Sequence, residues 1–220
     1  VTVSDECANV MKNSFPTLKN KVQVIHNIVS PTTIQALANT IQEDLYNRKQ
    51  NEKISVSVGR LHYQKGFEYA VEACKILIDR GYSIRWYVLG EGTEREALTK
   101  LIKKHHLEEK FILKGLQANP YPFIQQADFY IQPSRFEGKS IAIDEAKILR
   151  KPIIVTNFST AKDQINHEIN GLIVDLNVNA IADGIEKLIN DLSLNKRFLD
   201  YLSKEQLNTE QELLKLYQIL

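Results

Sequence analysis

Apolar residues recur along most of the chain in two alternating spacings. From residue 54 onward, short continuous apolar runs alternate with longer stretches in which apolar residues fall every three or four positions. The runs are typical of buried strands, and the stretches are typical of amphipathic helices. The expected strands are Ile54–Val58, Ile84–Leu89, Phe111–Leu113, Phe129–Gln132, Ile153–Val155 and Leu172–Val174. The expected helices are Phe67–Arg80, Glu94–His105, Pro120–Gln126, Ser140–Leu149, Thr160–Asn166, Val178–Leu192, Leu194–Leu202 and Thr209–Leu220.

This alternation of strands and helices predicts an α/β fold with a doubly wound parallel sheet of the Rossmann-like kind. Crossover connections between parallel strands are right-handed, so the helices cover both faces of the sheet. Gly81 follows the first of these helices and is placed to end it.

The pattern before residue 54 is weaker. Three short elements are expected there: strands at Val1–Ser4 and Val22–Ile25, and a helix at Asp5–Asn13 capped by Ser4. Pro31 is placed to open a further helix, whose apolar residues recur from Ile34 to Leu45. A strand–helix–strand piece of this size is too small to fold alone. We therefore expect the main domain to begin near residue 27.

Composition narrows the class of protein. The chain has 220 residues, of which 43% are hydrophobic, and its net charge is +1. Such a balance argues against nucleic acid as the main partner. No apolar run approaches the ~20 residues of a membrane span. The start lacks a signal-peptide layout and an initiator Met, which suggests a fragment or an excised domain. The use of only two cysteines fits a reducing cytoplasm. Of the two cysteines, Cys74 falls on an apolar helical stripe and is expected to be a core thiol.

Several polar loops follow the expected strands, and in a parallel sheet such loops share one rim, where ligands bind. The loop from Gly59 to Gly66 carries Arg60 and Lys65 at the start of a helix. A guanidinium can bind phosphate through two hydrogen bonds, and an ammonium acts as a point charge. The alternative is a solvated loop with two ordinary surface cations, because exposed Lys and Arg are the norm.

The loop from Ser134 to Ser140 leads into another helix, whose free amides near Ser140 and Ile141 favour an anion. Glu137 precedes that helix and would repel a phosphate, so it suits neutral hydroxyl groups better. Glu145 lies one to two turns into the helix and points back to the same rim. Together these features indicate a ligand with both phosphate and hydroxyl groups. For Glu145 the alternative is a solvated helix charge.

Other motifs exclude several kinds of chemistry. Gly90-Glu91-Gly92 resembles part of a dinucleotide fingerprint, but Arg95 replaces the third glycine and the motif follows the second regular strand. We interpret it as a tight turn that lets a ligand approach the backbone. The five histidines show no metal-ligand spacing, and there is no P-loop, HExxH or GxSxG motif. No metal is therefore expected.

The ordered set of motifs resembles a known family. The set is Gly59-Arg60-Leu61, Lys65-Gly66, Gly90-Glu91-Gly92, Ala127-Asp128, Pro133-Ser134, Glu137-Gly138, Glu145-Ala146, Lys151-Pro152 and Asn170-Gly171. It resembles the C-terminal, donor-binding half of a GT-B fold glycosyltransferase of the retaining GT4 type (glycosyl transferases group 1). Glu137 and Glu145 stand eight residues apart, as the family's E-x7-E motif requires.

The resemblance implies a nucleotide-sugar donor, with UDP-sugar favoured, and transfer of a hexosyl residue without a metal or other cofactor. Arg60 and Lys65 would hold the diphosphate and stabilise the leaving group, while Glu137 would bind the sugar and Glu145 the ribose. Arg60, Lys65 and Glu137 are thus the catalytic candidates. The further donor-binding candidates are Gly59, Gly90, Glu91, Gly92, Leu116, Gln117, Ser134, Gly138, Lys139, Ser140, Ile141 and Glu145.

The same resemblance implies a domain plan. Residues 1–26 would be a remnant of, or linker from, an N-terminal acceptor domain that the chain lacks. Residues 27–205 would be the donor-binding domain, and residues 206–220 a helix that crosses back to the missing domain. That domain would be a partner within the same polypeptide and would allow peripheral membrane contact. The whole enzyme would serve in cell-surface polysaccharide or glycoconjugate synthesis. The fragment alone is expected to bind nucleotide weakly and to catalyse little.

The sequence also departs from the family pattern. Lys139-Ser140-Ile141-Ala142 replaces a stretch that commonly contains glycine and proline, and Thr160 stands where glycine is common. Two alternatives on the same fold stay open: an inactive nucleotide-sugar-binding module, and a UDP-sugar epimerase. An epimerase usually places more histidines around the diphosphate than this chain offers. An NAD dehydrogenase is disfavoured by the missing fingerprint.

Overall fold

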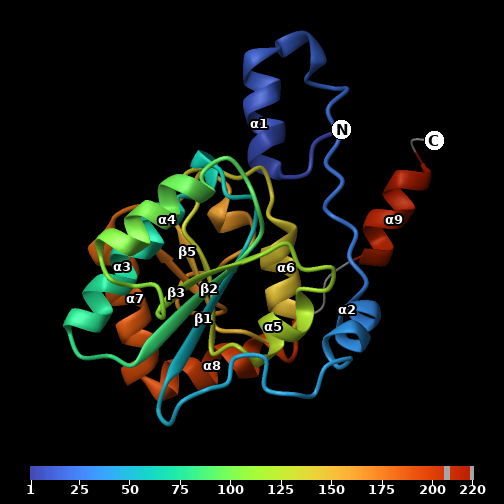
Figure 1. Cartoon of the computed structure of the whole chain (residues 1–220). Coiled ribbons are helices and arrows are strands. Elements are labelled where there is room, and N and C mark those ends of the chain that lie inside the picture. Colours follow the sequence, from blue (N-terminus) through green and yellow to red (C-terminus); the bar gives the residue numbers. More distant parts are fainter. Residues whose placement is uncertain (206–208, 219–220) are drawn as a thin grey trace.

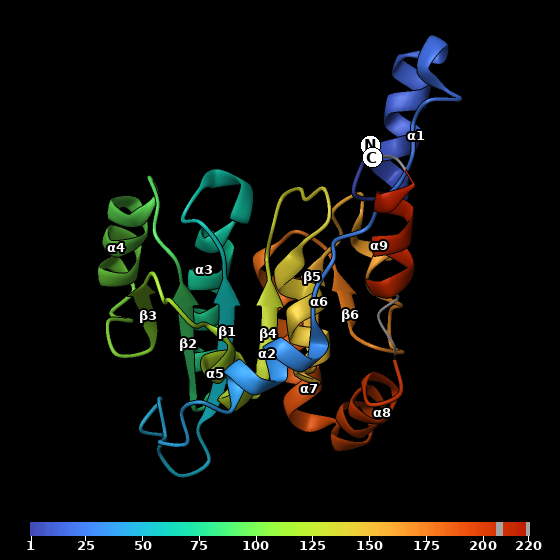
Figure 2. The ribbon, with the colours of Figure 1, turned by 90° about the vertical axis from the view of Figure 1, so that its right-hand side faces the viewer.

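The computed structural model describes residues 1–205 and 209–218 of the chain. Its centre is a parallel sheet of six strands in the order β3-β2-β1-β4-β5-β6 (Figures 1 and 2). The strands are β1 (Lys53–Val58), β2 (Ile84–Leu89), β3 (Phe111–Gly115), β4 (Phe129–Gln132), β5 (Ile153–Thr156) and β6 (Leu172–Val174). This order is that of a doubly wound Rossmann sheet, with the change of direction between β1 and β4. The predicted fold class is confirmed.

Helices cover both faces of the sheet. They are α1 (Asp5–Ser14), α2 (Pro31–Ala38), α3 (Phe67–Asp79), α4 (Arg95–Lys104), α5 (Tyr121–Gln126), α6 (Ile141–Ile148), α7 (Val178–Asn190), α8 (Leu192–Leu202) and α9 (Thr209–Tyr217). Three 3-10 turns add η1 (Pro16–Leu18), η2 (Tyr63–Lys65) and η3 (Ala161–Asp163). One apolar core lies under α3, α4, α7 and α8, and a second under α2, α5 and α6.

The strands belong to the sheet because side chains on both of their faces are buried. In β1, Ile54 and Val56 belong to the core under α2, α5 and α6, while β2 contributes Trp86 to the opposite core. Cys74 is fully buried in α3, as predicted, and burial raises the pKa of its thiol to about 12. Gly81 has a φ of +87°, which suits its position just beyond the end of α3.

The N-terminal segment differs from the prediction. The helix α1 forms with Ser4 as its cap, since the Ser4 hydroxyl accepts a hydrogen bond from the amide of Cys7. The two predicted strands beside it are reduced to one isolated parallel bridge between Thr2 and Val24. The predicted strands Val1–Ser4 and Val22–Ile25 were therefore too long, since only one residue of each is paired. Figures 1 and 2 show α1 projecting beyond the rim formed by the carboxyl ends of the strands.

Two predicted helices are shorter than their patterns suggested. α2 ends at Ala38, although apolar residues continue to Leu45, because side chains of Thr40 and Asn119 both donate hydrogen bonds to the carbonyl of Leu37. The predicted helix Thr160–Asn166 was wrong, since only the 3-10 turn η3 forms there. The predicted C-terminal helix is present as α9, and its residues 219–220, like residues 206–208 of the predicted crossover segment, lie outside the described part of the chain.

Candidate functional site

The sequence-predicted site residues lie along the carboxyl ends of the strands. Loops following β1 and β4 emerge side by side, because these two strands are neighbours at the switch point of the sheet. In doubly wound folds a crevice opens at this point, and ligands bind there. The topology thus places Lys65 and Glu137 on adjacent loops, although 72 residues separate them in the chain.

Glu137 is the centre of a dense hydrogen-bond network. Its Oε1 accepts hydrogen bonds from Lys65 Nζ at 2.6 Å, Gln132 Nε2 at 2.7 Å and Ser134 Oγ at 2.6 Å. Its Oε2 accepts from Gln64 Nε2 at 3.2 Å. The Glu137 side chain is only 7% exposed, so these donors supply the stabilisation that water would otherwise give a carboxylate. Four neighbouring groups therefore fix the orientation of this carboxylate.

The aliphatic stem of Lys65 packs over Gly59, at the end of β1. A Cβ atom at Gly59 would lie 3.0 Å from Lys65 Cε, so glycine leaves room for the lysine to cross the loop. The Lys65 side chain is 16% exposed. Its ammonium is thus held between the β1 and β4 loops, where it neutralises the charge of Glu137.

A second set of contacts joins the same two loops. The guanidinium of Arg135 lies 3.8 Å from the centre of the Tyr63 ring and donates a hydrogen bond to the Tyr63 carbonyl at 2.6 Å. It also forms an ion pair with Glu68 in α3. The backbone amide of Arg135 donates to the carbonyl of Gln64 at 2.8 Å. This clamp keeps η2, and hence Lys65, against the β4 loop.

Arg60 lies apart from this network, beside a small cavity. The cavity has a volume of about 230 Å³. Its lining residues are Val58, Gly59, Arg60, Leu89, Gly90, Glu91, Leu116, Gln117 and Pro120. Arg60 is exposed and makes no hydrogen bond or ion pair with any residue that the structure describes. One predicted catalytic residue, Arg60, and five predicted donor-binding residues therefore line one cavity; the five are Gly59, Gly90, Glu91, Leu116 and Gln117.

The glycines of the Gly90-Glu91-Gly92 turn are needed for contact between two loops of the chain itself. A Cβ atom at Gly90 would lie 2.0 Å from the Gly59 carbonyl oxygen, and one at Gly92 would lie 2.3 Å from that of Leu61. The amide of Leu61 donates to the carbonyl of Glu91 at 2.9 Å. The turn packs directly on the β1 loop, which refines our interpretation of it as an approach for a ligand.

The start of α6 is held by a side chain that the sequence did not single out. Gln164 Oε1 accepts a hydrogen bond from the Ser140 amide at 2.9 Å, and Gln164 Nε2 donates to the Ser140 carbonyl at 2.8 Å. The Ser140 amide, a predicted phosphate-binding group, is therefore already engaged. The amides of Ile141 and Ala142 have no hydrogen-bond partner within the described ranges 1–205 and 209–218.

Glu145 lies half-buried on α6 and has one hydrogen-bond donor nearby. The hydroxyl of Tyr121 donates to Glu145 Oε1 at 2.9 Å. Burial raises the pKa of Glu145, and the hydrogen bond from Tyr121 acts in the opposite direction. Burial, followed by the hydrogen bond to Glu145, raises the pKa of Tyr121 to about 12. One carboxylate oxygen thus accepts from a neutral phenol, as it could from a ligand hydroxyl.

Lys139 and Gly138 occupy the side of the loop nearest α1. Lys139 Nζ lies 2.6 Å from His26 Nδ1, and burial lowers the pKa of this lysine. Gly138 is exposed, and the atoms nearest to a Cβ placed there are Val3 Cγ2 at 3.8 Å and Cys7 Sγ at 3.9 Å. Both predicted donor-binding residues therefore face the N-terminal segment.

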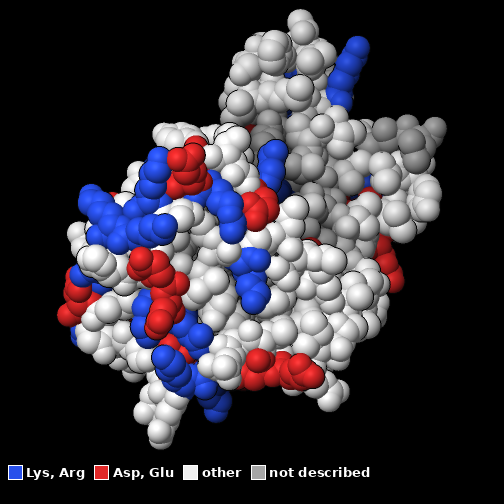
Figure 3. Space-filling model, viewed as in Figure 1, with Lys and Arg blue, Asp and Glu red and all other residues white. Residues whose placement is uncertain are grey.

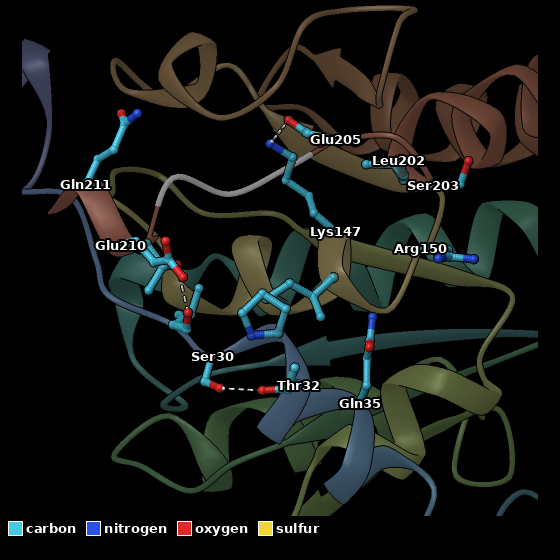
Figure 4. Close-up of a pocket in the computed structure, with 14 residues that line it drawn as sticks. Ser30, Thr32, Gln35, Lys147, Arg150, Leu202, Ser203, Glu205, Glu210 and Gln211 are labelled. Atoms are coloured by element: carbon cyan, nitrogen blue, oxygen red, sulfur yellow. Dashed lines mark hydrogen bonds and ion pairs between the residues drawn. The ribbon is translucent and has the colours of Figure 1, made fainter. Parts of the chain in front are cut away.

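A large cavity lies away from the predicted site. It has a volume of about 740 Å³ and is bounded by α2, α6, the end of α8 and the start of α9 (Figure 4). The ion pair between Lys147 Nζ and Glu205, at 2.6 Å, crosses part of it. None of the predicted catalytic or donor-binding residues lines this cavity.

Charged side chains of both signs are mixed on one face of the molecule. Figure 3 shows acidic and basic side chains interspersed over the half of the molecule that carries α3 and α4. Within the described residues, no group of three or more His, Cys, Asp or Glu side chains could hold a metal ion. No helix in the described part of the chain is long and apolar enough to cross a membrane.

Several residues that build the site were missed in the sequence. Gln132 ends the apolar run of β4, and Gln164 follows η3 in a segment predicted as a helix. Tyr121, Arg135 and Gln64 lie in or beside the expected loops. A buried polar residue at the end of an apolar strand, as at Gln132, is a signal that could have been used. The long-range hydrogen bonds of Gln164 leave no such local signal.

Comparisons with known proteins identify the family of the chain. The family described as Glycosyl transferases group 1 matches residues 38–204. An N-acetylgalactosaminyltransferase of Campylobacter jejuni that acts on a diphospho-undecaprenol acceptor is 30% identical over 202 residues, which cover 86% of this chain and 53% of that protein. The amylovoran biosynthesis glycosyltransferase AmsD of Erwinia amylovora is 30% identical over 199 residues, covering 90% and 54% respectively.

A solved structure shares the fold. A TarM mutant of S. aureus, crystallised with fondaparinux, alpha-GlcNAc-glycerol and UDP, superposes with a TM-score of 0.81 at 23% identity. The match covers 99% of this chain and 42% of that one. The chain spans about half the length of the curated relatives it matches. From the family match and the shared sheet, the chain belongs to the glycosyl transferases group 1 family and forms the C-terminal half of a GT-B fold.

Proposed function

We propose that this chain is the donor-binding domain of a retaining glycosyltransferase of the GT4 type that uses a UDP-sugar. The observation that carries the proposal is that Arg60 and Lys65, on the loop after β1, and the start of α6, on the loop after β4, lie on neighbouring loops at the switch point of the sheet. Two cations and a helix N-terminus offer complementary charge to a diphosphate. UDP in the complex of the TarM mutant supports the choice of nucleotide.

Each part of the donor has a counterpart at the rim. Arg60, beside the cavity of about 230 Å³, and Lys65 hold the diphosphate and stabilise charge on the departing nucleotide. Leu116 and Gln117 flank the base in the same cavity. Glu145 accepts hydrogen bonds from the ribose, exchanging the Tyr121 hydroxyl for a ligand hydroxyl.

Glu137 has a more constrained role than the resemblance alone implies. Because Lys65, Gln132 and Ser134 all donate to its Oε1, that oxygen is occupied. Its Oε2 receives one weaker contact from Gln64 at 3.2 Å. We therefore assign sugar-hydroxyl binding to Oε2, with Oε1 fixing the position of Lys65.

The whole enzyme would transfer a hexosyl residue to an acceptor held by an N-terminal domain. Residues 1–26 then link to that domain, residues 27–205 bind the donor, and residues 206–220 return toward the acceptor domain. The contact between the His26 amide and Glu212 in α9, at 2.8 Å, brings the linker and the returning helix together. The relatives named for undecaprenol-linked and amylovoran synthesis favour a role in making cell-surface glycoconjugates. We expect the enzyme itself to lie in the cytoplasm. We expect neither a metal nor another cofactor to take part.

The alternatives predict different behaviour. An inactive binding module would bind nucleotide without transfer, and the intact set of Arg60, Lys65, Glu137 and Glu145 argues against it. An epimerase would need histidines around the diphosphate. The nearest imidazole on the β1 loop is that of His62, whose Nδ1 accepts the amide of Gln64 and caps η2.

Calorimetric titration with UDP, GDP and ADP tests the proposal. UDP should bind best to the chain, and Lys65→Ala should weaken binding by about 1–3 kcal/mol through loss of a charge-assisted contact. Arg80→Ala provides a matched control, because Arg80 pairs with Asp183 and Glu186 between α3 and α7. Equal and negligible binding of all three nucleotides would reject the donor site. Sugar transfer by this chain alone at the rate of a full enzyme would reject the need for an acceptor domain.

A further inference from the structure

We infer that Gln164 is a positioning residue for the donor phosphates, acting through the first turn of α6. The inference rests on the proposed function, because it assigns a role in the same donor site. Gln164 is 4% exposed and directly follows η3, and its side-chain hydrogen bonds go to Ser140 and Asp144 at the start of α6. Its side chain therefore contacts the loop and not a ligand.

The Gln164 amide group satisfies the backbone of Ser140 on both sides. Its Oε1 accepts from the Ser140 amide at 2.9 Å, and its Nε2 donates to the Ser140 carbonyl at 2.8 Å. The same Nε2 donates to Asp144 Oδ1 at 2.9 Å. A primary amide has one acceptor and two donor hydrogens, so all three functions are used. A single side chain thus joins the cap residue of α6 to the first turn of the helix.

Thr160 holds the other end of the same loop. Thr160 is 1% exposed, and its hydroxyl donates a hydrogen bond to the Glu137 carbonyl at 2.8 Å. Thr160 and Gln164 are four residues apart, and they form hydrogen bonds with the backbone of Glu137 and of Ser140 respectively. Because the loop is held at both ends, the direction of the amides that follow Ser140 is set before any ligand arrives.

Those amides are the ones available to an anion. Ser140 donates to Gln164, whereas Ile141 and Ala142 have no hydrogen-bond acceptor among the residues described. The first amides of a helix bind phosphate when they point at it, and their contribution falls when the helix start is misaligned. Gln164 therefore fixes the start of α6, and with it the orientation of the amides of Ile141 and Ala142, at the end of the loop whose Glu137 contacts Lys65.

Titration of UDP against Gln164→Leu tests this inference. Leucine keeps much of the volume but removes all three hydrogen bonds, and we expect the affinity for UDP to fall about tenfold. In ¹H–¹⁵N spectra, the UDP-induced shift of the Ile141 amide should also shrink or change direction. Gln164→Glu is a second variant, which keeps the length and the acceptor but cannot donate to the Ser140 carbonyl. It should weaken UDP binding in the same direction.

Gln126 offers a matched control. Its Oε1 accepts from the Leu45 amide at 3.0 Å and its Nε2 donates to the Glu43 carbonyl at 2.9 Å, so it makes the same kind of two-sided contact. It lies at the end of α5, just before β4, and therefore at the amino ends of the strands, away from the rim that carries the predicted site. Gln126→Leu should lower thermal stability to a similar degree and leave the affinity for UDP within about twofold of the unmodified chain.

The outcomes separate the two proposals. If the unmodified chain binds UDP and both Gln164 variants bind it equally well, the positioning role is rejected and the donor site stands. If Gln126→Leu weakens UDP binding as much as Gln164→Leu, the effect is general destabilisation and the positioning role is again rejected. If the unmodified chain binds no nucleoside diphosphate, the proposed function fails and the role of Gln164 fails with it.

Discussion

Lys65 Nζ lies 2.6 Å from Glu137 Oε1, and this ion pair joins the loop after β1 to the loop after β4. The two side chains are 16% and 7% exposed, so the pair is largely shielded from water. A phosphate that binds Lys65 must therefore share the ammonium with a carboxylate that is already present. The ammonium has three hydrogens, which allows it to serve both groups.

Removing only the cation should destabilise the fold as well as the complex. Lys65→Met leaves the Glu137 carboxylate buried with neutral donors alone, and we expect the free energy of unfolding to fall by about 1–3 kcal/mol. The double variant Lys65→Met/Glu137→Gln should recover most of this loss, because it removes both charges. Urea denaturation measures both values. UDP binding should be weakened in both variants, so recovery of stability without recovery of UDP affinity is the expected signature.

Glycine substitutions should distinguish close packing from open space within the predicted donor loops. Gly92→Ala places a Cβ 2.3 Å from the Leu61 carbonyl oxygen, which forces the two loops apart. We expect a loss of at least about 2 kcal/mol of stability. Gly138→Ala meets no atom closer than 3.8 Å, and its stability should stay within about 0.5 kcal/mol of the unmodified chain. Thermal denaturation compares the two, and similar losses would contradict the packing that we describe.

The clamp formed by Arg135 should depend on the shape of the guanidinium. Arg135→Lys keeps the charge but loses the planar contact with Tyr63, and we expect about 1–2 kcal/mol lower stability. Nucleotide binding should weaken as well, since η2 carries Lys65. Arg80→Lys, on the face covered by α3 and α7, serves as the control and should change neither quantity measurably. Equal effects of the two changes on UDP affinity would show that Arg135 does not support the site.

Much of the fold follows from local pattern, and the site follows from topology. The strands β2 and β4 begin and end where their apolar runs do, because buried strands need apolar side chains on both faces. Because parallel strands end at the same edge, the sequence predicted that the loops of Lys65 and Glu137 share one rim. Spacing in the sequence does not reveal that β1 and β4 are neighbours, which brings these two side chains into contact.

The errors arose where distant side chains decide local structure. The segment at Thr160–Asn166 has helical spacing, but Thr160 and Gln164 make hydrogen bonds to the loop at Glu137 and Ser140 instead of continuing a helix. α2 ends where the nearby Thr40 and Asn119, which is more than eighty residues away, both donate hydrogen bonds to the Leu37 carbonyl. No local pattern encodes such partners. The neutral donors around Glu137 were missed for the same reason.

The buried carboxyl of Glu145 should make stability depend on pH. Burial raises the pKa of Glu145, so the folded chain holds this proton more tightly than the unfolded chain does. The resulting stabilisation is complete below the unfolded pKa and is lost as the pH rises through the folded pKa. Above that pH the charged carboxylate opposes folding.

Glu145→Gln keeps an acceptor for the Tyr121 hydroxyl without the charge, and it should melt at a higher temperature than the unmodified chain at pH 8. At pH 8, a gain of about 1 kcal/mol would raise the melting temperature by about 2–4 °C. Near pH 4 the two melting temperatures should be equal. Glu96→Gln, whose side chain is 81% exposed, should show no such pH dependence. A Glu145→Gln chain that is less stable at pH 8 would mean that the carboxylate stabilises the free protein. UDP affinity should fall for Glu145→Gln even where stability rises, because a neutral amide accepts ribose hydroxyls more weakly.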